Sequence, residues 1–360
     1  MGVRNVLKKA TFEAVGEYNV LDALRRSGKR SLGVDMYVVL HWAFSRYPDY
    51  HQQLVLDPDC NCEKVYEDVV QFVEYLVEKG FTLILVYDGL KLDYKISEED
   101  REKRRERAVQ MQQWQYAYDV TPVQAKRIYD LLAPKITQVV APYEADSQLA
   151  YLYFNGSVDC VLTSDTDLIF YGVEDIIFFI CGSFKLYRGL ETTEDLMDKN
   201  TRLNSLSLVR KWILPLLIGN DFTRGIRGYG IEKSMSVATT ISLPSEQLSK
   251  EEYLREIVDR VYAMITIRNQ TKEELLMEFK KIIQVYTTAP VWTADTQLIQ
   301  LDQNREVYLP SDQYVYENMC KKWYNDIEKL MEKSLNETER KETSKKYAKN
   351  EVNSLTLKSY

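Results

Sequence analysis

A chain of 360 residues, 45% of them hydrophobic and 28% charged, can bury a large core without disulfides or a structural metal. The net charge of −7 decides neither for nor against a polyanionic partner, because clustered carboxylates neutralised by bound cations would account for it. The five cysteines are odd in number and form no CxxC pair, which excludes a disulfide scaffold and a zinc ribbon. No apolar run approaches the roughly 18 residues of a membrane helix, so we expect a soluble intracellular protein without a membrane partner.

The first half of the chain alternates between strand and helix patterns. Apolar runs bounded by turn residues predict strands over 31–35, 81–87, 158–163 and 175–180. Helical patterns cover 36–44, 64–79 and 143–154, and the second of these ends at Gly80, a residue typical of helix ends. This alternation predicts an α/β fold with a doubly wound, mostly parallel sheet flanked by helices.

The pattern then becomes mainly helical. A densely charged stretch at 95–107 and an aromatic, glutamine-rich piece at 111–118 interrupt the first half. Beyond Leu206, helices are expected over 212–218, from 231, over 251–265 and over 272–285. A glycine-rich stretch, 219–230, separates the first two, and the polar tail from Lys333 is expected to be flexible.

Acidic residues follow the predicted strands at the points where the strands end. Asp35 closes the first strand, Asp88 follows the second, and Asp165 and Asp167 follow the third two positions apart. Ligands of open α/β sheets bind beyond the carboxyl ends of the strands. Carboxylates gathered there cannot all stay ionised without cations, so their clustering predicts a metal site.

Three further acids belong to the candidate cluster. Glu144 and Asp146 begin a predicted helix, where residues two apart diverge by roughly 200°, so both can face one site only at an irregular helix start or through water. Asp221 lies where a helix meets the glycine-rich stretch. A single Asp in such a position is more often a helix cap than a ligand. With only two histidines, His41 and His51, a multi-metal site must use oxygen ligands, which favours Mg²⁺ or Mn²⁺ over zinc.

The order of these acids, with their neighbours, resembles the flap endonuclease and XPG-like family of structure-specific 5′ nucleases. The matching stretches are VDMYVVLH (34–41), LVYDG (85–89), VAPYEADSQLAYL (140–152), TSDTDLIFYG (163–172) and IGNDFTRGIRGYG (218–230), together with GVRNVLKKA after Met1. The stretch APYEADSQLAYL, a histidine at position 41 and the weaker segment 291–310 are most similar to the exonuclease 1 branch.

The resemblance implies a PIN-like nuclease core that hydrolyses DNA phosphodiesters with two Mg²⁺ ions, Mn²⁺ being the alternative. It assigns Asp165, Asp167 and Asp221 to one metal, and Asp35, Asp88 and Glu144 to the other, with Asp146 between them. The expected activity is a 5′ to 3′ exonuclease that also cuts flaps, in DNA repair, recombination or replication.

Further residues gain roles by the same resemblance. Lys95 and an arginine, best aligned at Arg104 although Arg101 and Arg105 are also candidates, would grip the scissile phosphate, and His41 would stack on a base. The loop containing Gly225, Arg227, Gly228 and Gly230 resembles a helix–two-turn–helix element that binds duplex DNA, with a K⁺ ion. The plain alternatives are a solvated charged helix, an ordinary surface histidine and an ordinary loop.

The resemblance also divides the chain. It implies an N-terminal nuclease region (1–110), a charged helical arch (95–135), an internal nuclease region with the helix–two-turn–helix (136–235), a mainly helical part (236–332) and the tail (333–360). The interval between Asp88 and Glu144 is shorter than in typical relatives, so the arch is expected to be shortened and threading of long flaps is in question.

Alternative functions are a flap endonuclease or junction-cutting relative, a haloacid-dehalogenase-like phosphohydrolase suggested by Asp165-Thr166-Asp167, and an inactive DNA-binding scaffold. Expected partners are DNAs with recessed, nicked or flapped 5′ ends, bound by a monomer in the nucleus. No sliding-clamp-binding box is visible in the tail.

Overall fold

The computed structural model describes residues 2–301 except 4, 11, 13–18, 58–59, 90–94, 96, 134, 190–202, 246, 267–269 and 294–297. All described elements belong to one unit, Met1–Val307. The second unit, Tyr308–Tyr360, lies outside the described residues, as do the predicted tail and most of segment 291–310.

A six-stranded sheet forms the centre of the described unit, in the order β3-β2-β1-β4-β5-β6. The strands are β1 (Ser31–Asp35), β2 (Thr82–Tyr87), β3 (Thr137–Val140), β4 (Cys160–Thr163), β5 (Asp175–Ile180) and β6 (Ser183–Arg188). The pairs among β1 to β5 are parallel, whereas β6 runs antiparallel to β5. The predicted α/β class and the four predicted strands are confirmed; β3 and β6 were not predicted.

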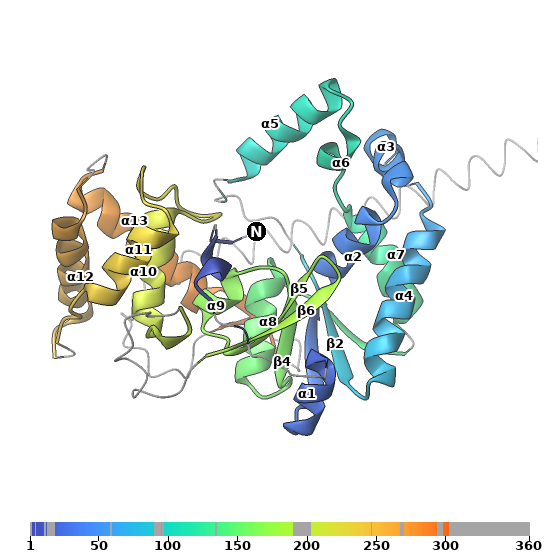
Figure 1. The fold of residues 1–360 in the computed structure, drawn as a ribbon, viewed down its shortest axis with the longest axis horizontal. Helices are drawn as coiled ribbons and strands as arrows, with labels where there is room; N and C mark the ends of the chain where they lie inside the picture. The colour runs from blue at the N-terminus through green and yellow to red at the C-terminus, as the bar shows by residue number, and fades with distance from the viewer. Residues whose placement is uncertain are drawn as a thin grey trace, which may run out of the picture. The chain divides into compact units, whose positions relative to one another are not determined.

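Helices cover both faces of this sheet, as Figure 1 shows. One face carries α1 (Val20–Arg26), α2 (Met36–Ser45), α4 (Glu63–Glu78) and α7 (Pro122–Leu132), and the other carries α8 (Ala145–Phe154) and α9 (Asp167–Tyr171). Helix α3 (Pro48–Leu56) packs against α2 and α6 (Trp114–Ala117) instead. Alternate strand residues serve the two faces: Leu32 and Val34 join the core under α4, while Gly33 faces Leu149 of α8. Burial of each such apolar side chain stabilises the fold by about 1.5–3 kcal/mol.

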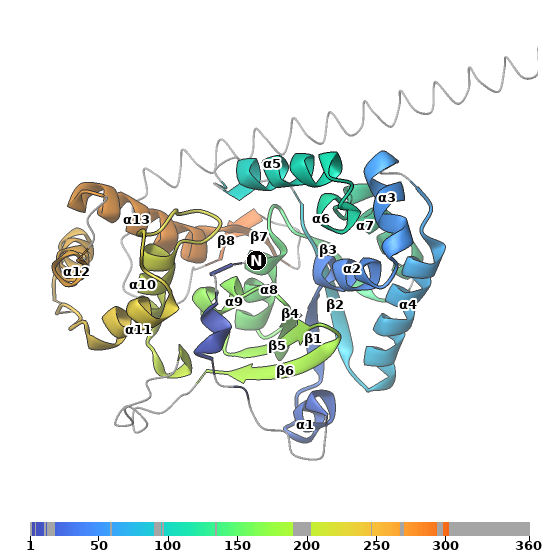
Figure 2. The same cartoon turned by 45° about the horizontal axis from the view of Figure 1, so that its top comes forward.

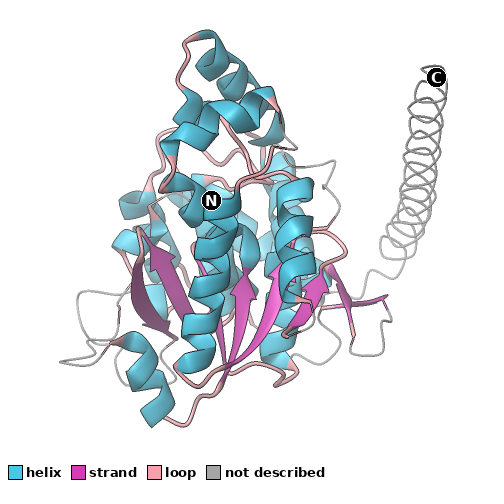
Figure 3. Ribbon diagram, turned by 90° about the vertical axis from the view of Figure 1, so that its right-hand side faces the viewer, coloured by secondary structure: helices cyan, strands magenta, loops and turns pink. Residues whose placement is uncertain are grey.

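The order of the strands places the ends of several of them at one site. From β1 the chain proceeds through β2 to β3 on one side, and β4 then returns to pair with the other side of β1. Most arrows of the sheet therefore point the same way in Figure 3, toward one edge. The carboxyl ends of β1, β2, β3 and β4 meet there, at a point where strand order reverses, which is where ligands bind in folds of this kind.

Two helices extend beyond that edge. They are α5 (Ser97–Gln110), which contains the charged stretch, and α6 (Trp114–Ala117), from the aromatic piece. Figures 1 and 2 show α5 on the side of the unit toward which the parallel strands point.

The helical part that follows comprises α10 (Leu208–Ile218), α11 (Ile231–Thr240), α12 (Lys250–Met264) and α13 (Lys272–Thr288), and each lies within a few residues of the prediction. Two short 3₁₀ turns precede it, at Val6–Lys8 near the N-terminus and at Leu203–Ser205 before α10. Both α12 and α13 begin with a capping box, Ser249 with Glu252 and Thr271 with Glu274, which satisfies their free N–H groups. Within the described ranges, every helix is too short or too polar to cross a bilayer.

A hairpin after α13 is fastened to α8 by one side chain. Strands β7 (Pro290–Trp292) and β8 (Leu298–Gln300) pair with each other and not with the main sheet. The buried Gln148 of α8 accepts from the backbone N–H of Trp292 at 2.7 Å and donates to its carbonyl at 2.9 Å. These two bonds are like those that a neighbouring strand would form with β7. Helix α8 therefore holds the hairpin in place, although the two are far apart in the sequence.

We expect Gln148→Leu to lower the free energy of unfolding by about 1–3 kcal/mol, because two partly buried backbone groups of Trp292 lose their partners. Urea denaturation followed by circular dichroism measures this change. Gln71→Leu, at an exposed position of α4, is the matched control and should leave stability within error. Equal stability of the two variants would contradict the anchoring role of Gln148.

Candidate metal centre

Asp35 ends β1 and caps the helix that follows. Its Oδ1 accepts from the N–H groups of Tyr37 and Val38 at 3.1 and 3.3 Å, and its Oδ2 accepts from the Thr163 hydroxyl at 2.9 Å. The side chain is buried, and burial raises its pKa from 3.8 to about 6 despite these bonds. Asp35 is therefore both a cap and a member of the candidate cluster, which reconciles the two roles that the sequence left open.

Asp88 and Glu144 lie at the ends of β2 and β3. Asp88 accepts from the N–H of Ala145, the first residue of α8, at 2.7 Å. Although Asp88 is exposed, the surrounding protein partly removes water from its carboxylate, and this is the main cause of its raised pKa. The charges of Glu144 and Asp35 add to the effect, so that its pKa rises to about 8. Gly89 allows the backbone after β2 to lie close to Ala141, because a Cβ at position 89 would lie 1.9 Å from the Ala141 carbonyl oxygen.

The start of α8 is irregular in the way that Glu144 and Asp146 require. The predicted helix from Tyr143 begins two residues later, at Ala145, since Glu144 has an extended backbone (φ −84°, ψ 138°) and caps the helix. Because Glu144 lies before the first helical residue, helical spacing does not turn its side chain away from Asp146. The two carboxylates are close enough for the charge of Glu144 to help raise the pKa of Asp146.

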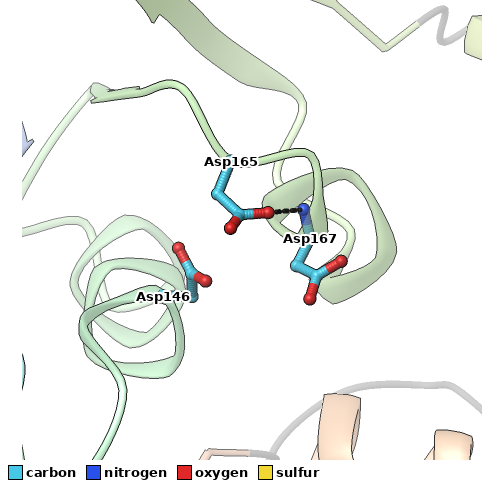
Figure 4. A group of neighbouring side chains, drawn as sticks. All are labelled: Asp146, Asp165 and Asp167. Carbon is cyan, nitrogen blue, oxygen red and sulfur yellow. Dashed lines mark hydrogen bonds between the residues drawn. The ribbon is translucent and has the colours of Figure 1, made fainter. Parts of the chain in front are cut away.

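Asp146 from the start of α8 converges with Asp165 and Asp167 from the turn between β4 and α9 (Figure 4). Each offers an oxygen within 4.8 Å of the others, a separation that one metal ion can span. Asp165 Oδ1 accepts from the N–H of Asp167 at 3.0 Å, which fixes the turn between β4 and α9. Burial first, and then the neighbouring carboxylates, raise the pKa of both Asp146 and Asp167 well above the usual value.

One oxygen of the Asp167 carboxylate has no hydrogen-bond donor among the residues that the structure describes. Asp167 is 5% exposed, and this oxygen, Oδ1, is buried. Gly2 lies against the same atoms: a Cβ on Gly2 would lie 2.5 Å from Oδ1 of Asp165 and of Asp167. The donor set consists of carboxylate oxygens, the ligands preferred by Mg²⁺ and Mn²⁺, and a buried free oxygen fits such an ion.

Basic side chains of the α5 segment meet this cluster. Lys95 pairs with Glu144 and lies 4.0 Å from Asp221. Burial alone would lower the pKa of Lys95, but the Glu144 and Asp221 carboxylates outweigh it and hold the pKa above its ordinary value. Arg101 donates to Asp221 at 2.7 Å, which joins α5 to the α10–α11 loop.

The arginine expected to share this role, Arg104, is exposed in the structure, whereas Arg101 is about as buried as Lys95. Arg105 pairs with Asp119 instead. Motif alignment favoured the RRER stretch, and helical spacing alone could not decide which arginine faces the carboxylates.

Asp221 belongs to a tight turn after α10. Asn220 Oδ1 accepts from the N–H groups of Phe222 and Thr223 at 3.0 and 2.8 Å, while its Nδ2 donates to the hydroxyl of Tyr286 at 2.9 Å. Tyr286 is completely buried on α13, and burial together with the nearby Asp167 charge raises its pKa. Tyr286 carried no local sequence signal, because its role depends on contact with segments far away in the chain.

The glycine-rich loop after Asp221 connects α10 to α11. Gly225 has φ +68°, and a Cβ there would lie 2.4 Å from backbone atoms of Ile218 and Gly219. Gly228 also has a positive φ and is exposed, as are Arg227 and Gly230. Gly230 caps α11 without a side-chain bond, so the loop presents backbone and a cation to solvent.

His41 lies on α2, outside the carboxylate cluster. Its side chain is 46% exposed and its Nε2 is 3.7 Å from Asp119. Crowding by the protein lowers its pKa, and Arg105 and Arg101 add to this against the opposing charge of Asp119. The ring is accessible, and its base-stacking role stays a prediction.

Comparison with known proteins gives a consistent result. Residues 135–221 match the XPG I-region, a stretch that contains Glu144, Asp146, Asp165, Asp167 and Asp221. The chain is 30% identical over 228 residues to exodeoxyribonuclease 1 of Schizosaccharomyces pombe, covering 58% of this chain and 38% of that protein. It is 21% identical over 243 residues to flap endonuclease 1 of Picrophilus torridus, covering 60% and 70% of the two chains.

Among solved structures, the catalytic core of Rad2 in complex with DNA substrate has the same fold. The TM-score is 0.51 at 17% identity, covering 89% of this chain and 94% of that one. The exonuclease relatives are longer proteins: this chain spans 38%, 30% and 21% of those from S. pombe, Arabidopsis thaliana and Oryza sativa.

The raised pKa values generate a pH prediction for the metal-free protein. A carboxylate whose folded pKa exceeds its unfolded value contributes stability below the unfolded pKa and loses it as pH rises through the folded pKa. Asp35 (3.8 to about 6) and Asp88 (3.8 to about 8) define a window from about pH 4 to pH 8. In EDTA, the Tm contribution of the cluster should therefore fall across this window, and Mg²⁺ should restore it at pH 8.

Asp167→Asn isolates this effect. At pH 8 in EDTA it should raise Tm by about 2–8 °C, because relief of about 1–2 kcal/mol of charge burial moves Tm by about 2–4 °C per kcal/mol. Mg²⁺ should raise the Tm of the wild type more than that of the variant. Asp130→Asn, an exposed residue paired with Lys126, serves as the control. A variant that is destabilised in EDTA and still fully stabilised by Mg²⁺ would contradict the assignment.

Proposed function

We propose that this chain belongs to the XPG-like family of 5′ nucleases and to its exonuclease 1 branch. On that premise, it is a divalent-metal-dependent deoxyribonuclease. It removes nucleotides 5′ to 3′ from DNA ends and also cuts 5′ flaps. The observation that carries the proposal is the convergence of Asp146, Asp165 and Asp167 within 4.8 Å, in a chain that matches the XPG I-region.

The carboxylates are proposed to hold two divalent ions. Asp165, Asp167 and Asp221 would ligate one, Asp35, Asp88 and Glu144 the other, and Asp146 would lie between them; the buried, unpartnered Oδ1 of Asp167 supports this assignment. When bound, Mg²⁺ or Mn²⁺ supplies activation of a water molecule and neutralisation of charge on the phosphate and leaving oxygen.

The chain's own cations would orient the scissile phosphate. Lys95 and Arg101 already lie against Glu144 and Asp221, so a phosphate entering beside these carboxylates meets two donors on one segment. Arg104 is the alternative from sequence alignment. Charge-assisted contacts of this kind act most strongly where water is excluded, as at these half-buried side chains.

The remaining surface is proposed to bind DNA on both sides of the cut. His41 would stack on a base near the cleaved end, and the loop with Gly225, Arg227, Gly228 and Gly230 would hold a duplex phosphate with a K⁺ ion. Substrates would carry recessed, nicked or flapped 5′ ends, bound by a monomer in the nucleus. Preference for long flaps or junctions is the alternative specificity.

A panel of Mg²⁺-containing reactions tests the proposal. We expect efficient release of nucleotides from recessed and nicked 5′ ends, because these require no threading through a short arch. Asp165→Ala should lower the rate by at least about 100-fold while DNA affinity changes little. A strong preference for long flaps, with refusal of flaps blocked by a bulky 5′ protein adduct, would favour a threading flap endonuclease. Cleavage by Asp165→Ala at the wild-type rate would contradict the metal mechanism.

Lys95 and the arginines of α5 give a separate prediction. Lys95→Ala should slow single-turnover cleavage by about 100-fold and weaken DNA affinity much less, because the charge acts on the scissile phosphate. Arg101→Ala should slow the reaction more than Arg104→Ala, since Arg101 contacts Asp221 and Arg104 is exposed. Unchanged single-turnover rates with reduced affinity in Lys95→Ala would make it a general backbone contact.

A further inference from the structure

A single phenol on α13 lies between two segments that carry candidate metal ligands. Tyr286 is completely buried, and its hydroxyl accepts a hydrogen bond from Asn220 Nδ2 at 2.9 Å. Its ring packs edge-on against Tyr171, with centroids 5.0 Å apart, and is tilted against Phe170 at 5.8 Å. One contact therefore reaches the turn that contains Asp221, and the others reach the helix that begins at Asp167.

The Asn220 contact fixes the orientation of a side chain that builds the turn. Its amide oxygen holds the N–H groups of Phe222 and Thr223 and the Thr223 hydroxyl, at 2.8 to 3.0 Å. With Oδ1 occupied by the turn and Nδ2 by Tyr286, the amide cannot rotate without breaking bonds at both ends. Asp221 lies between Asn220 and Phe222, so this turn sets the orientation of the Asp221 side chain.

The second segment, α9, is a short buried helix that needs support from outside. It spans only Asp167–Tyr171, and its residues are all buried. On one side the indole of Trp212, from α10, donates to the Phe170 carbonyl at 2.8 Å. Tyr286 packs against Phe170 and Tyr171 from α13, so its ring and its hydroxyl act on different carboxylate-bearing segments.

We propose that Tyr286 is a positioning residue for the metal centre, which holds Asp221 at a fixed distance from Asp167 through Asn220. The inference rests on the proposed metal site and assigns Tyr286 no contact with DNA or with the reacting atoms. Partners that orient metal ligands typically contribute 10- to 100-fold to metal affinity. Because Tyr286 retains its ring packing when only the hydroxyl is removed, the two contributions can be separated.

The test is direct Mn²⁺ binding to the metal-free protein without DNA, measured by titration calorimetry and by the electron paramagnetic resonance signal of free Mn²⁺. Tyr286→Phe should weaken binding of the Asp221-dependent ion by about tenfold. The same variant should require about tenfold more Mg²⁺ for half-maximal cleavage, with the rate at saturating Mg²⁺ within about twofold of wild type.

Tyr66→Phe is the matched control. Tyr66 is also a buried tyrosine whose hydroxyl pairs with a side-chain amide, that of Gln124, and it also accepts from Arg127 at 3.2 Å; it joins α4 to α7, away from the carboxylates. Both variants should lose thermal stability, and only Tyr286→Phe should lose metal affinity. Equal loss of affinity in the two variants, or none in Tyr286→Phe, overturns the proposal.

A double-mutant cycle tests the route through Asn220. If the hydroxyl acts through this amide, Tyr286→Phe combined with Asn220→Ala binds Mn²⁺ no more weakly than Asn220→Ala alone. Additive losses overturn that route. Absence of Mn²⁺ binding in the wild type would instead remove the proposed metal centre itself, a result distinct from normal binding in wild type and Tyr286→Phe alike.

Discussion

Mutual repulsion among carboxylates gathered at one sheet edge is the constraint on which the rest of this structure depends. Asp146, Asp165 and Asp167 each offer an oxygen within 4.8 Å of the others. Asp35 at the end of β1 and Glu144 at the start of α8 are close enough to act on the charge of Asp146, and both act on Asp88 after β2. A folded protein tolerates this arrangement only if protons, basic side chains or metal ions offset the charge. In the structure protons and basic side chains can do so, as the raised pKa values and the pairs formed by Lys95 and Arg101 indicate.

The surrounding fold holds the carboxylates in place against that repulsion. Backbone N–H groups bind Asp35 at the start of α2 and Asp88 at the start of α8, while the buried α9 carries Asp167. Glycines permit the close backbone approaches at Gly2 and Gly89. Lys95, just before α5, pairs with Glu144, and Arg101 of α5 pairs with Asp221. A metal or a substrate phosphate would therefore compete with contacts that already exist, which couples the α5 segment to the state of the centre.

Much of the fold and of the cluster was predictable because its signals are local. Apolar runs marked the buried strands, and an acid at the end of Ser31–Asp35 or after Thr82–Tyr87 falls at the ligand-binding edge in any parallel sheet. The irregular start of α8 was likewise required by the spacing of Glu144 and Asp146. The contacts of Arg101 with Asp221, of Gly2 with the carboxylates and of Tyr286 with Asn220 were not predictable. Each depends on which segments pack together, a property that no short stretch of sequence records.

The most direct measurement of the central claim is anomalous X-ray diffraction from crystals of this protein soaked in Mn²⁺. We expect an anomalous peak bounded by Asp146, Asp165 and Asp167, and a second one near Asp35, Asp88 and Glu144, with Lys95 turned away from Glu144. Peaks that occur only elsewhere, or carboxylates that keep their pairs with Lys95 and Arg101 at saturating Mn²⁺, would contradict it.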